Sequence, residues 1–195
     1  LCKKRKFMPH HRHIACSAAI LTMPDTHYDL VRAGVATYGF WPSRDTYYQC
    51  LQQNPRGKSG NPMRRVVTWK SVVMDIKEVP AGEFIGYGTA FQATRRMEIA
   101  VIPVGYGNGY PRGQSNRGHV LIHGKKAPIV GLINMNLFMV DVSHIPNIEL
   151  GDEVVLLGKQ KNNTINVSSF TNATQLLNNE MMSRLPTAIP RYIVK

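Results

Sequence analysis

The stretch Glu78-Val-Pro-Ala-Gly-Glu-Phe-Ile-Gly-Tyr-Gly88 ends a strand-like run with Pro80 and Gly82, and then presents Tyr87 between two glycines. A glycine on each side removes bulk and permits backbone angles that other residues avoid, so a second molecule can approach the phenol closely. A glycine-rich turn with an incidental tyrosine is the alternative interpretation. The rest of the sequence is needed to distinguish a functional tyrosine from an incidental one.

The chain after residue 60 has the pattern of a small β domain. Short apolar runs alternate with Gly, Pro and Asn, which is typical of a small barrel or sandwich. We expect strands at residues 68–79, 97–104, 119–123, 127–130, 138–142, 153–157 and 189–194, and helical spacing over 168–185. Gly124-Lys125-Lys126 is expected to turn a hairpin between two of these strands.

The chain before residue 60 indicates an α/β unit. Ile14–Leu21 is expected as a buried strand, and a short helix is expected to open at Pro24 and to carry Tyr28, Leu30 and Val31. Arg32–Phe40 is expected as a second buried strand or a tight turn, which favours parallel pairing. The polar residues 43–65 form the expected linker. The predicted fold class is therefore α/β plus all-β, with domains at residues 1–60 and 61–195.

Composition leaves several kinds of partner open. The 195 residues are 43% hydrophobic and carry a net charge of +12, which suits nucleic acid, an anionic membrane surface or a small anionic ligand. Lys3–Lys6 is the one dense basic run, and the scattered remainder is typical of solvated surface. No apolar run reaches the length needed to span a bilayer. The chain begins with Leu1 rather than methionine, and we expect it to start partway into a longer protein.

Metal and redox signals are weak. Three widely spaced cysteines without a C-x-x-C pair indicate free thiols in a reducing, cytoplasmic compartment. His10, His11 and His13 have no carboxylate or cysteine at ligand spacing, so no metal site is expected. Gly105–Gly109 resembles a phosphate loop but lacks the lysine and the following helix that such a loop requires.

Taken in chain order, nine motifs resemble those of the alanine racemases that depend on pyridoxal 5'-phosphate (PLP). The matching stretches are His13–Ala19, Val31–Gly39, Lys77–Gly88, Ile102–Arg112, Gly124–Gly131, Asn134–Asn136, Met139–Val142, Gly151–Val155 and Ile189–Arg191. The resemblance implies the end of a TIM-type (β/α)8 barrel, followed by the family's C-terminal β domain. It also implies an amino-acid racemase that exchanges the α-proton between two bases.

The resemblance assigns roles to residues around the cofactor. Arg32 matches the arginine that faces the pyridine nitrogen, where a permanent cation keeps that nitrogen unprotonated and disfavours transamination. Ser17, Gly34 and Val35 match contacts to the cofactor phosphate. Tyr87 matches the catalytic acid/base on one face of the substrate, and its phenol needs neighbouring charge because a free phenol has a pKa of about 10.

Other matches concern the substrate and the partner subunit. Met135 matches a residue whose backbone contacts the substrate carboxylate, and Tyr106 and Arg112 match the corridor that leads to the site. In the family Tyr87, Tyr106 and Met135 reach into the partner's barrel, so a homodimer with shared active sites is expected.

The chain also departs from the family pattern. The PLP lysine lies upstream in the family, and this sequence lacks it. Cys16 stands where asparagine is usual, Leu132 replaces a corridor arginine, and Asn136 replaces an aspartate. Asn179 stands where alanine racemases have a tyrosine that touches the phosphate and crowds the substrate's methyl group.

The change at Asn179 leaves the substrate open. Asparagine is smaller and offers a donor and an acceptor, and pairing a buried substrate hydroxyl is worth roughly 1–3 kcal/mol. The sequence therefore resembles serine/alanine racemases of the vancomycin-resistance type, whose racemase domain follows a membrane-embedded region. An ordinary alanine racemase, a broad-specificity racemase, and a basic β-barrel that binds nucleic acid are the alternatives.

Overall fold

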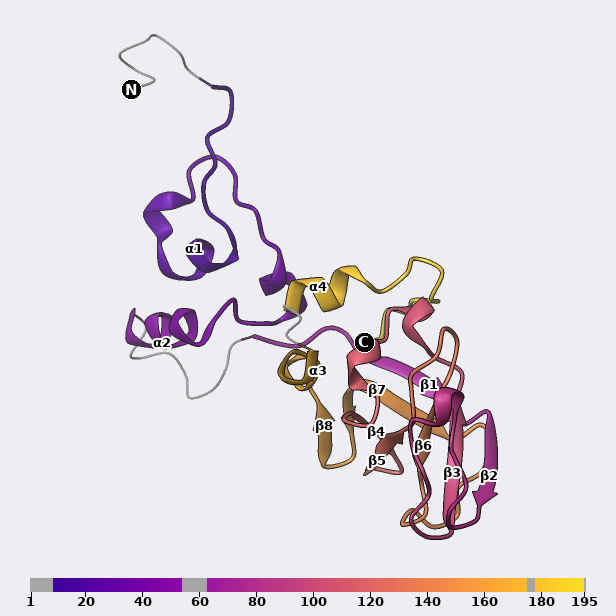
Figure 1. The fold of residues 1–195 in the computed structure, drawn as a ribbon. Coiled ribbons are helices and arrows are strands. Elements are labelled where there is room, and N and C mark those ends of the chain that lie inside the picture. The colour runs from indigo at the N-terminus through magenta and orange to yellow at the C-terminus, as the bar shows by residue number, and fades with distance from the viewer. Residues whose placement is uncertain (1–8, 54–62, 175–177, 195) are drawn as a thin grey trace. The chain divides into compact units, whose positions relative to one another are not determined.

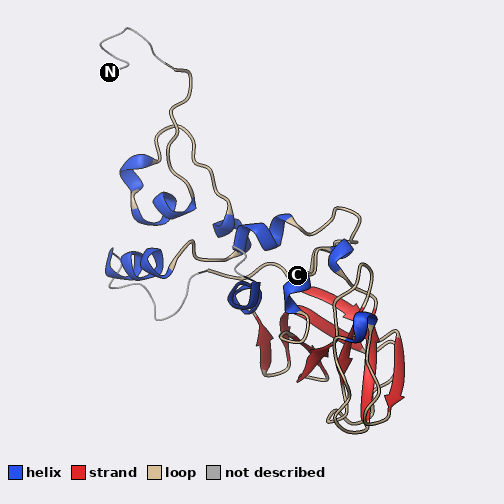
Figure 2. Cartoon of the chain, in the orientation of Figure 1, coloured by secondary structure: helices blue, strands red, loops and turns tan. Residues whose placement is uncertain are grey.

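The computed structural model describes residues 9–53, 63–174 and 178–194, without the side chains of residues 171–174, 178 and 179 (Figures 1 and 2). The chain divides into two compact units, Leu1–Val66 and Val67–Lys195. Each unit is described by itself below.

Short helices make up the first unit, rather than the strands expected from its sequence. The elements are α1 (Ser17–Thr22), the 3-10 turns η2 (Pro24–Thr26) and η3 (Val35–Tyr38), and α2 (Arg44–Gln53). Parallel pairing among its described residues amounts to one bridge, between Cys16 and Arg32. The expected strand Ile14–Leu21 is wrong from Ser17 onward, because Ser-Ala-Ala-Ile-Leu favours a helix once the chain has left its bridge.

One further expectation for this unit is wrong, and one of the two alternatives for Arg32–Phe40 is confirmed. The helix that opens at Pro24 ends at Thr26, so it does not carry Tyr28, Leu30 and Val31, and these three side chains are exposed. Arg32–Phe40 forms a tight turn rather than a strand. Gly39 ends η3 with a φ of 77°, and a Cβ there would lie 1.9 Å from the carbonyl oxygen of Arg64. Only glycine allows that close approach.

The second unit is an antiparallel sheet of eight strands, which Figure 2 shows in red. The strands are β1 (Trp69–Val72), β2 (Asp75–Val79), β3 (Met97–Ile102), β4 (His119–Ile122), β5 (Lys125–Val130), β6 (Phe138–Asp141), β7 (Glu153–Gln160) and β8 (Asn163–Ile165). Their order is β1-β7-β4-β5-β6-β3-β2, and β8 pairs with β7. The pattern of alternating apolar residues therefore located every strand region from 69 to 157.

The first expected strand, at residues 68–79, is two strands that lie at opposite ends of the sheet. At the junction the N–H of Val73 donates to Asp152 O on one side, and the N–H of Met74 donates to Val101 O on the other, both at 2.9 Å. Val73 thus bonds to the chain at the start of β7, and the next residue, Met74, bonds to β3. The sheet therefore curls round until its two edges meet, as in a small barrel.

The hairpin between β4 and β5 has a shorter turn than the sequence suggested. Ile122 pairs with Lys125, so the turn is His123-Gly124, with φ values of 53° and 79°. A two-residue turn with positive φ at both positions has a twist that matches the twist of the paired strands. Lys125 and Lys126, which were expected in the turn, belong to β5.

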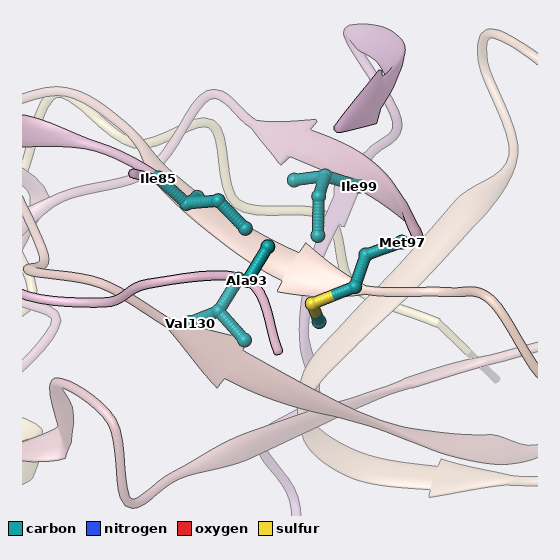
Figure 3. Close-up of a cluster of buried hydrophobic side chains, with 5 residues drawn as sticks. All are labelled: Ile85, Ala93, Met97, Ile99 and Val130. Carbon is teal, nitrogen blue, oxygen red and sulfur yellow. The ribbon is translucent and has the colours of Figure 1, made fainter. Parts of the chain in front are cut away.

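Two groups of buried side chains fill this unit. Figure 3 shows one of them converging between the ribbons, made of Ile85, Ala93, Met97, Ile99 and Val130. The other is aromatic: Tyr110 is fully buried, and its ring lies 4.9–5.7 Å from those of Trp69, Phe138 and Phe170. Burial raises the pKa of the Tyr110 phenol, so this tyrosine is a core residue and no acid/base group.

The tail partly matches expectation. Helices α3 (Val167–Thr174) and α4 (Asn178–Ser183) occupy the region of helical spacing. The last expected strand, Ile189–Val194, is wrong: it has no strand pairing and Ile193 is fully exposed. Pro190 offers no N–H for a ladder, and both ends of the sheet path are taken by β1 and β2.

Candidate functional site

Tyr87 lies at the tip of a hairpin-like loop formed by residues 82–93. Hydrogen bonds join the two arms from Gly82 N–H to Ala93 O (2.7 Å), from Ala93 N–H to Glu83 O (2.8 Å) and from Ile85 N–H to Phe91 O (2.8 Å). The tip is therefore Gly86–Ala90. Its tyrosine is 74% exposed, so the phenol is presented to whatever approaches this unit.

The glycines on either side of Tyr87 are required by the backbone. Gly86 and Gly88 have φ values of 80° and 70°, a left-handed conformation that side chains rarely adopt. A Cβ on Gly86 would also lie 2.9 Å from the terminal methyl carbon of Met139. The glycine pattern in the sequence thus reflects the geometry that carries the phenol.

A second loop pair brings Tyr106 and Met135 together. The 3-10 turn η5 (Tyr106–Asn108) is bound to the neighbouring loop, since Tyr106 N–H donates to Asn134 O (3.0 Å) and Gly107 N–H donates to Met135 O (2.8 Å). Tyr106 is 46% exposed and Met135 is 56% exposed. Within the described part of this unit the N–H of Met135 has no acceptor, which suits a residue whose backbone binds a carboxylate.

Gly105 makes this approach possible. A Cβ on Gly105 would lie 2.2 Å from Asn134 O and 2.3 Å from Met135 O, which is far inside van der Waals contact. Its φ of −145° is ordinary for any residue, so lack of space alone requires glycine here. The sequence had marked Gly105–Gly109 as a weak phosphate loop, and the structure gives the first of these glycines a packing role.

Two residues that depart from the family pattern, Leu132 and Asn136, lie close to the same loops. Leu132 is half-buried beside the hairpin tip, and its Cδ1 would lie 3.7 Å from a Cβ on Gly88. Asn136 is exposed next to Gly107, whose Cβ would lie 3.5 Å from Asn136 Oδ1. Arg112, the other corridor residue, is exposed at the start of the 3-10 turn η6 (Arg112–Gln114). Leucine at 132 leaves that position without a cation.

The first unit gathers Ser17, Gly34 and Val35 at the starts of two short helices. The buried hydroxyl of Ser17, at the start of α1, accepts hydrogen bonds from Gly34 N–H (2.8 Å) and Ala36 N–H (3.4 Å) at the start of η3. First-turn N–H groups have no carbonyl partner inside their own helix. The two helix starts therefore form one patch of donors around a hydroxyl.

Cys16 adds a reactive group to this patch. The N–H groups of Ala19 and Ala18 lower the pKa of its exposed thiol, with a smaller contribution from the Arg32 guanidinium. Arg32 is itself exposed, and its guanidinium donates from Nη2 to Ile14 O over a long 3.5 Å. The sequence identified Cys16 only as a departure from the family, and its place before a helix start was the signal for an activated thiol.

These groups fit the phosphate end and the ring of PLP. A phosphate monoester accepts hydrogen bonds from a hydroxyl and from helix-start N–H groups, which the patch around Ser17 supplies. An exposed guanidinium two residues before Gly34 can face the ring.

Several expectations fall outside these two groups. Asn179 lies in α4, and its side chain is outside the described residues. Among the described residues no cluster of three metal-binding side chains exists, and none of their helices is long and apolar enough to cross a membrane. A cavity of about 360 Å³ lies in the second unit, and no residue of its lining is a predicted site residue. It is lined by Gln114, Arg117, Gly118, His119, Ile165, Ser169 and Phe170.

Together these features define a class of protein: one unit has N–H groups of a helix start gathered around the Ser17 hydroxyl, and the other is an antiparallel β domain that presents a tyrosine between glycines. The family profile described as the alanine racemase C-terminal domain matches residues 66–193, and that of the N-terminal domain matches residues 1–42. The chain therefore belongs to the alanine racemase family, whose enzymes depend on PLP.

Individual relatives agree with this assignment. An alanine racemase of Leptospira interrogans is 38% identical over 183 residues, which is 94% of this chain and 46% of the relative. One of Syntrophobacter fumaroxidans is 45% identical over 148 residues, or 76% of this chain and 36% of the relative. The chain thus spans about half the length, or less, of the relatives it matches.

Solved structures show the same fold. The alanine racemase from Bacillus anthracis with bound L-Ala-P matches with a TM-score of 0.83 and 27% identity, over 100% of this chain and 47% of that one. The enzyme from Streptomyces lavendulae matches with a TM-score of 0.82 and 34% identity, over 99% and 48%. The antiparallel sheet described above is the C-terminal β domain of this fold.

Proposed function

We propose that this chain is the C-terminal half of an amino-acid racemase that interconverts L- and D-alanine. The observation that carries the proposal is Tyr87, held by left-handed glycines at an exposed hairpin tip in a β domain of this family. Residues 1–60 supply the end of the TIM-type barrel, and residues 61–195 supply the domain that brings the tyrosine.

The residues of the first unit hold the cofactor. Ser17, Gly34 and Val35 would hold the phosphate through one hydroxyl and helix-start N–H groups, and Arg32 would supply a cation to the pyridine ring. When bound, PLP supplies an electron sink that makes the α-hydrogen of an amino acid acidic. Because Arg32 carries a permanent cation, it keeps the ring nitrogen unprotonated, and this limits delocalisation and disfavours transamination.

Tyr87 exchanges a proton at the α-carbon from one face of the amino acid. In the family a lysine serves the opposite face, so a proton removed on one side is replaced on the other. Met135 binds the carboxylate through its N–H group and so orients the α-carbon toward the phenol. Tyr106 and Arg112 line the corridor through which the amino acid arrives.

The active unit is a homodimer that shares its sites. Tyr87, Tyr106 and Met135 are large side chains that this chain leaves 46–74% exposed on loops held by close backbone contacts. A second copy whose barrel covers them would bury apolar surface and exclude water from the reacting atoms. The product suits the supply of D-amino acids to cell-wall precursors, in the cytoplasm.

Tyr87→Phe in the intact parent protein tests the reaction. The change removes one oxygen atom, so we expect kcat for both enantiomers of alanine to fall at least about a thousandfold, in the range for loss of a general acid/base. Absorbance of bound PLP should be unchanged. Tyr48→Phe, an exposed tyrosine of α2, is the matched control. Racemisation that survives Tyr87→Phe would refute the proposal.

Serine is the second candidate substrate, because Asn179 replaces the tyrosine that crowds the substrate's methyl group in the family. An asparagine there leaves room for a hydroxyl and can pair with it, which links the parent to serine/alanine racemases of vancomycin resistance, whose racemase domain follows a membrane-embedded region. Asn136 in place of aspartate could widen the pocket for larger side chains too.

Asn179→Tyr should lower kcat/KM for serine roughly tenfold more than for alanine. Equal losses for both substrates would exclude the serine assignment.

A further inference from the structure

Asn116 connects two loops through its side-chain amide. Its Nδ2 donates to Ala90 O at 3.0 Å, and its Oδ1 accepts from Gly131 N–H at 2.6 Å. The residue has a φ of 56°, a left-handed conformation that asparagine tolerates better than most residues do. Both ends of the amide are therefore engaged, each with the backbone of a different segment.

Ser115 reinforces the connection one residue earlier. Its hydroxyl accepts from Ile133 N–H at 3.0 Å and donates to Arg112 O at 2.6 Å. The segment Gly131–Ile133 thus donates two N–H groups, from Gly131 to Asn116 and from Ile133 to Ser115. We call the pair Ser115 and Asn116 the clamp.

The segments that the clamp joins carry the candidate site residues. Ala90 is the last residue of the hairpin tip that presents Tyr87. The segment Gly131–Ile133 leads directly into the turn of Met135, which is bound to Tyr106 through the contacts described above.

The hydrophobic core fixes both segments at their roots, and in the second segment it also buries Ile133. Ile85 precedes the tip and Val130 precedes Gly131, and both side chains belong to the cluster in Figure 3. A Cβ on Gly131 would lie 2.9 Å from Ile85 O, so the two backbones are already close there. Beyond the roots the tip contains two left-handed glycines and needs another restraint, which Asn116 supplies at Ala90.

We propose that Ser115 and Asn116 are positioning residues that set the distance between the Tyr87 phenol and the Met135 backbone. The inference rests on the function proposed above, because only a proton transfer makes that distance matter. The clamp touches neither substrate nor cofactor and acts through the loops. Catalysis is sensitive to such spacing, since a misplacement of about 1 Å can cost a hundredfold in rate.

Three substitutions in the intact parent protein separate the two hydrogen bonds. Asn116→Gly keeps the left-handed backbone and removes both bonds. Asn116→Asp keeps an acceptor for Gly131 N–H and places a carboxylate oxygen against Ala90 O, so it breaks only the bond to the tip. Asn147→Gly is the matched control, because Asn147 also has a φ of 56° and lies in the turn before β7.

We expect kcat for alanine to fall about tenfold in both Asn116 variants. KM should rise only in Asn116→Gly, which also releases the Met135 segment, and Asn147→Gly should keep both constants. Hydrogen exchange gives a readout apart from activity: the Gly131 amide should exchange about tenfold faster in Asn116→Gly and at the normal rate in Asn116→Asp. If kcat of both variants stays within twofold of the control, or if Gly131 exchange is unchanged in Asn116→Gly, the clamp is refuted.

The two proposals fail in distinguishable ways. If the unmodified parent does not racemise alanine, the proposed function is wrong and the positioning role is refuted with it, whereas exchange at Gly131 still shows whether Asn116 ties the loops. If the parent racemises alanine, Tyr87→Phe abolishes it and the Asn116 variants behave as the control, then the function stands and only the clamp is wrong.

Discussion

Replacing Gly105 with alanine should separate the two loops that carry Tyr106 and Met135. The new methyl carbon would lie 2.2 Å from Asn134 O and 2.3 Å from Met135 O. Both oxygens belong to the backbone, so no side-chain rotation relieves the contact. The loops must move apart by about 1 Å to reach ordinary contact, which strains or breaks the two hydrogen bonds between them.

The magnitude follows from three contributions. Overpacking costs typically about 1–3 kcal/mol, and each of the two hydrogen bonds contributes about 1 kcal/mol. Against this, glycine to alanine at an ordinary φ stabilises by about 0.4–1 kcal/mol through the unfolded chain. We expect a net loss of about 2–4 kcal/mol in the stability of this domain. Because Met135 moves, kcat/KM for alanine should also fall about a hundredfold.

Urea unfolding of the intact parent measures the first effect, and a racemisation assay measures the second. Gly151→Ala is the matched control, because Gly151 has a φ of 89° and nothing lies within 4 Å of its Cβ position. That change should cost about 1–2 kcal/mol through backbone strain alone and leave kcat/KM unchanged. A Gly105→Ala protein as stable as wild type, with normal activity, would refute the steric argument.

Two further predictions concern single ionisable groups. Because N–H groups of Ala18 and Ala19 lower the pKa of Cys16, iodoacetamide should modify Cys16 faster than Cys50 at neutral pH. Added PLP should slow the modification of Cys16 and leave that of Cys50 unchanged. Equal protection of both thiols would contradict a phosphate site beside Cys16. The pKa of Asp152 is lowered mainly by the N–H of Glu149 and also by His123, whose Nε2 lies 2.9 Å from the carboxylate. A lowered pKa stabilises the folded protein above the unfolded value of about 4 and no longer does so below the folded one, so Asp152→Asn should lower the urea midpoint near pH 7 and match wild type in acid. A difference that persists below both pKa values would exclude the carboxylate charge as its cause.

The sequence predicted the β domain well because its signals are local. Alternating burial along a strand requires only neighbouring residues, and the expected strands 97–104 and 138–142 match β3 and β6 to within two residues. The division of residues 68–79 into β1 and β2 could not be predicted in this way. It depends on which strands flank Val73 and Met74, and no pattern of apolar residues encodes that choice.

The first unit was predicted poorly for a related reason. Ile14–Leu21 is apolar enough for a buried strand, but Ser17 to Thr22 are also good residues for a helix, and the local sequence does not decide between the two. Short apolar runs are ambiguous until their tertiary partners are known. The bridge from Cys16 to Arg32, which ends the extended segment, is such a partner.

For the candidate site too, the sequence suggested some residues and not others. It suggested the side chains of the site, but not the residues that hold their loops in place. Family resemblance supplied Tyr87, Tyr106 and Met135 as candidates, because they lie within motifs that match the family. It supplied no role for Ser115 and Asn116, whose contacts are to the backbone of other loops. The sequence nevertheless contained a signal for this turn, because Ser-Asn-Arg-Gly lies between two expected strands. Apart from glycine, asparagine is the residue that best accepts a left-handed turn position.

Backbone contacts of this kind explain why the domain can keep reactive side chains on exposed loops. Tyr87 has little side-chain packing, with three quarters of its surface exposed, so its own contacts cannot fix it. The loop is fixed instead by main-chain groups, through Ile85 N–H at one end and Ala90 O at the other. The phenol therefore stays free to meet a partner while its Cα is held in place, and substitutions at Gly105, Gly131 or Asn116 should alter the reaction without touching any reacting atom.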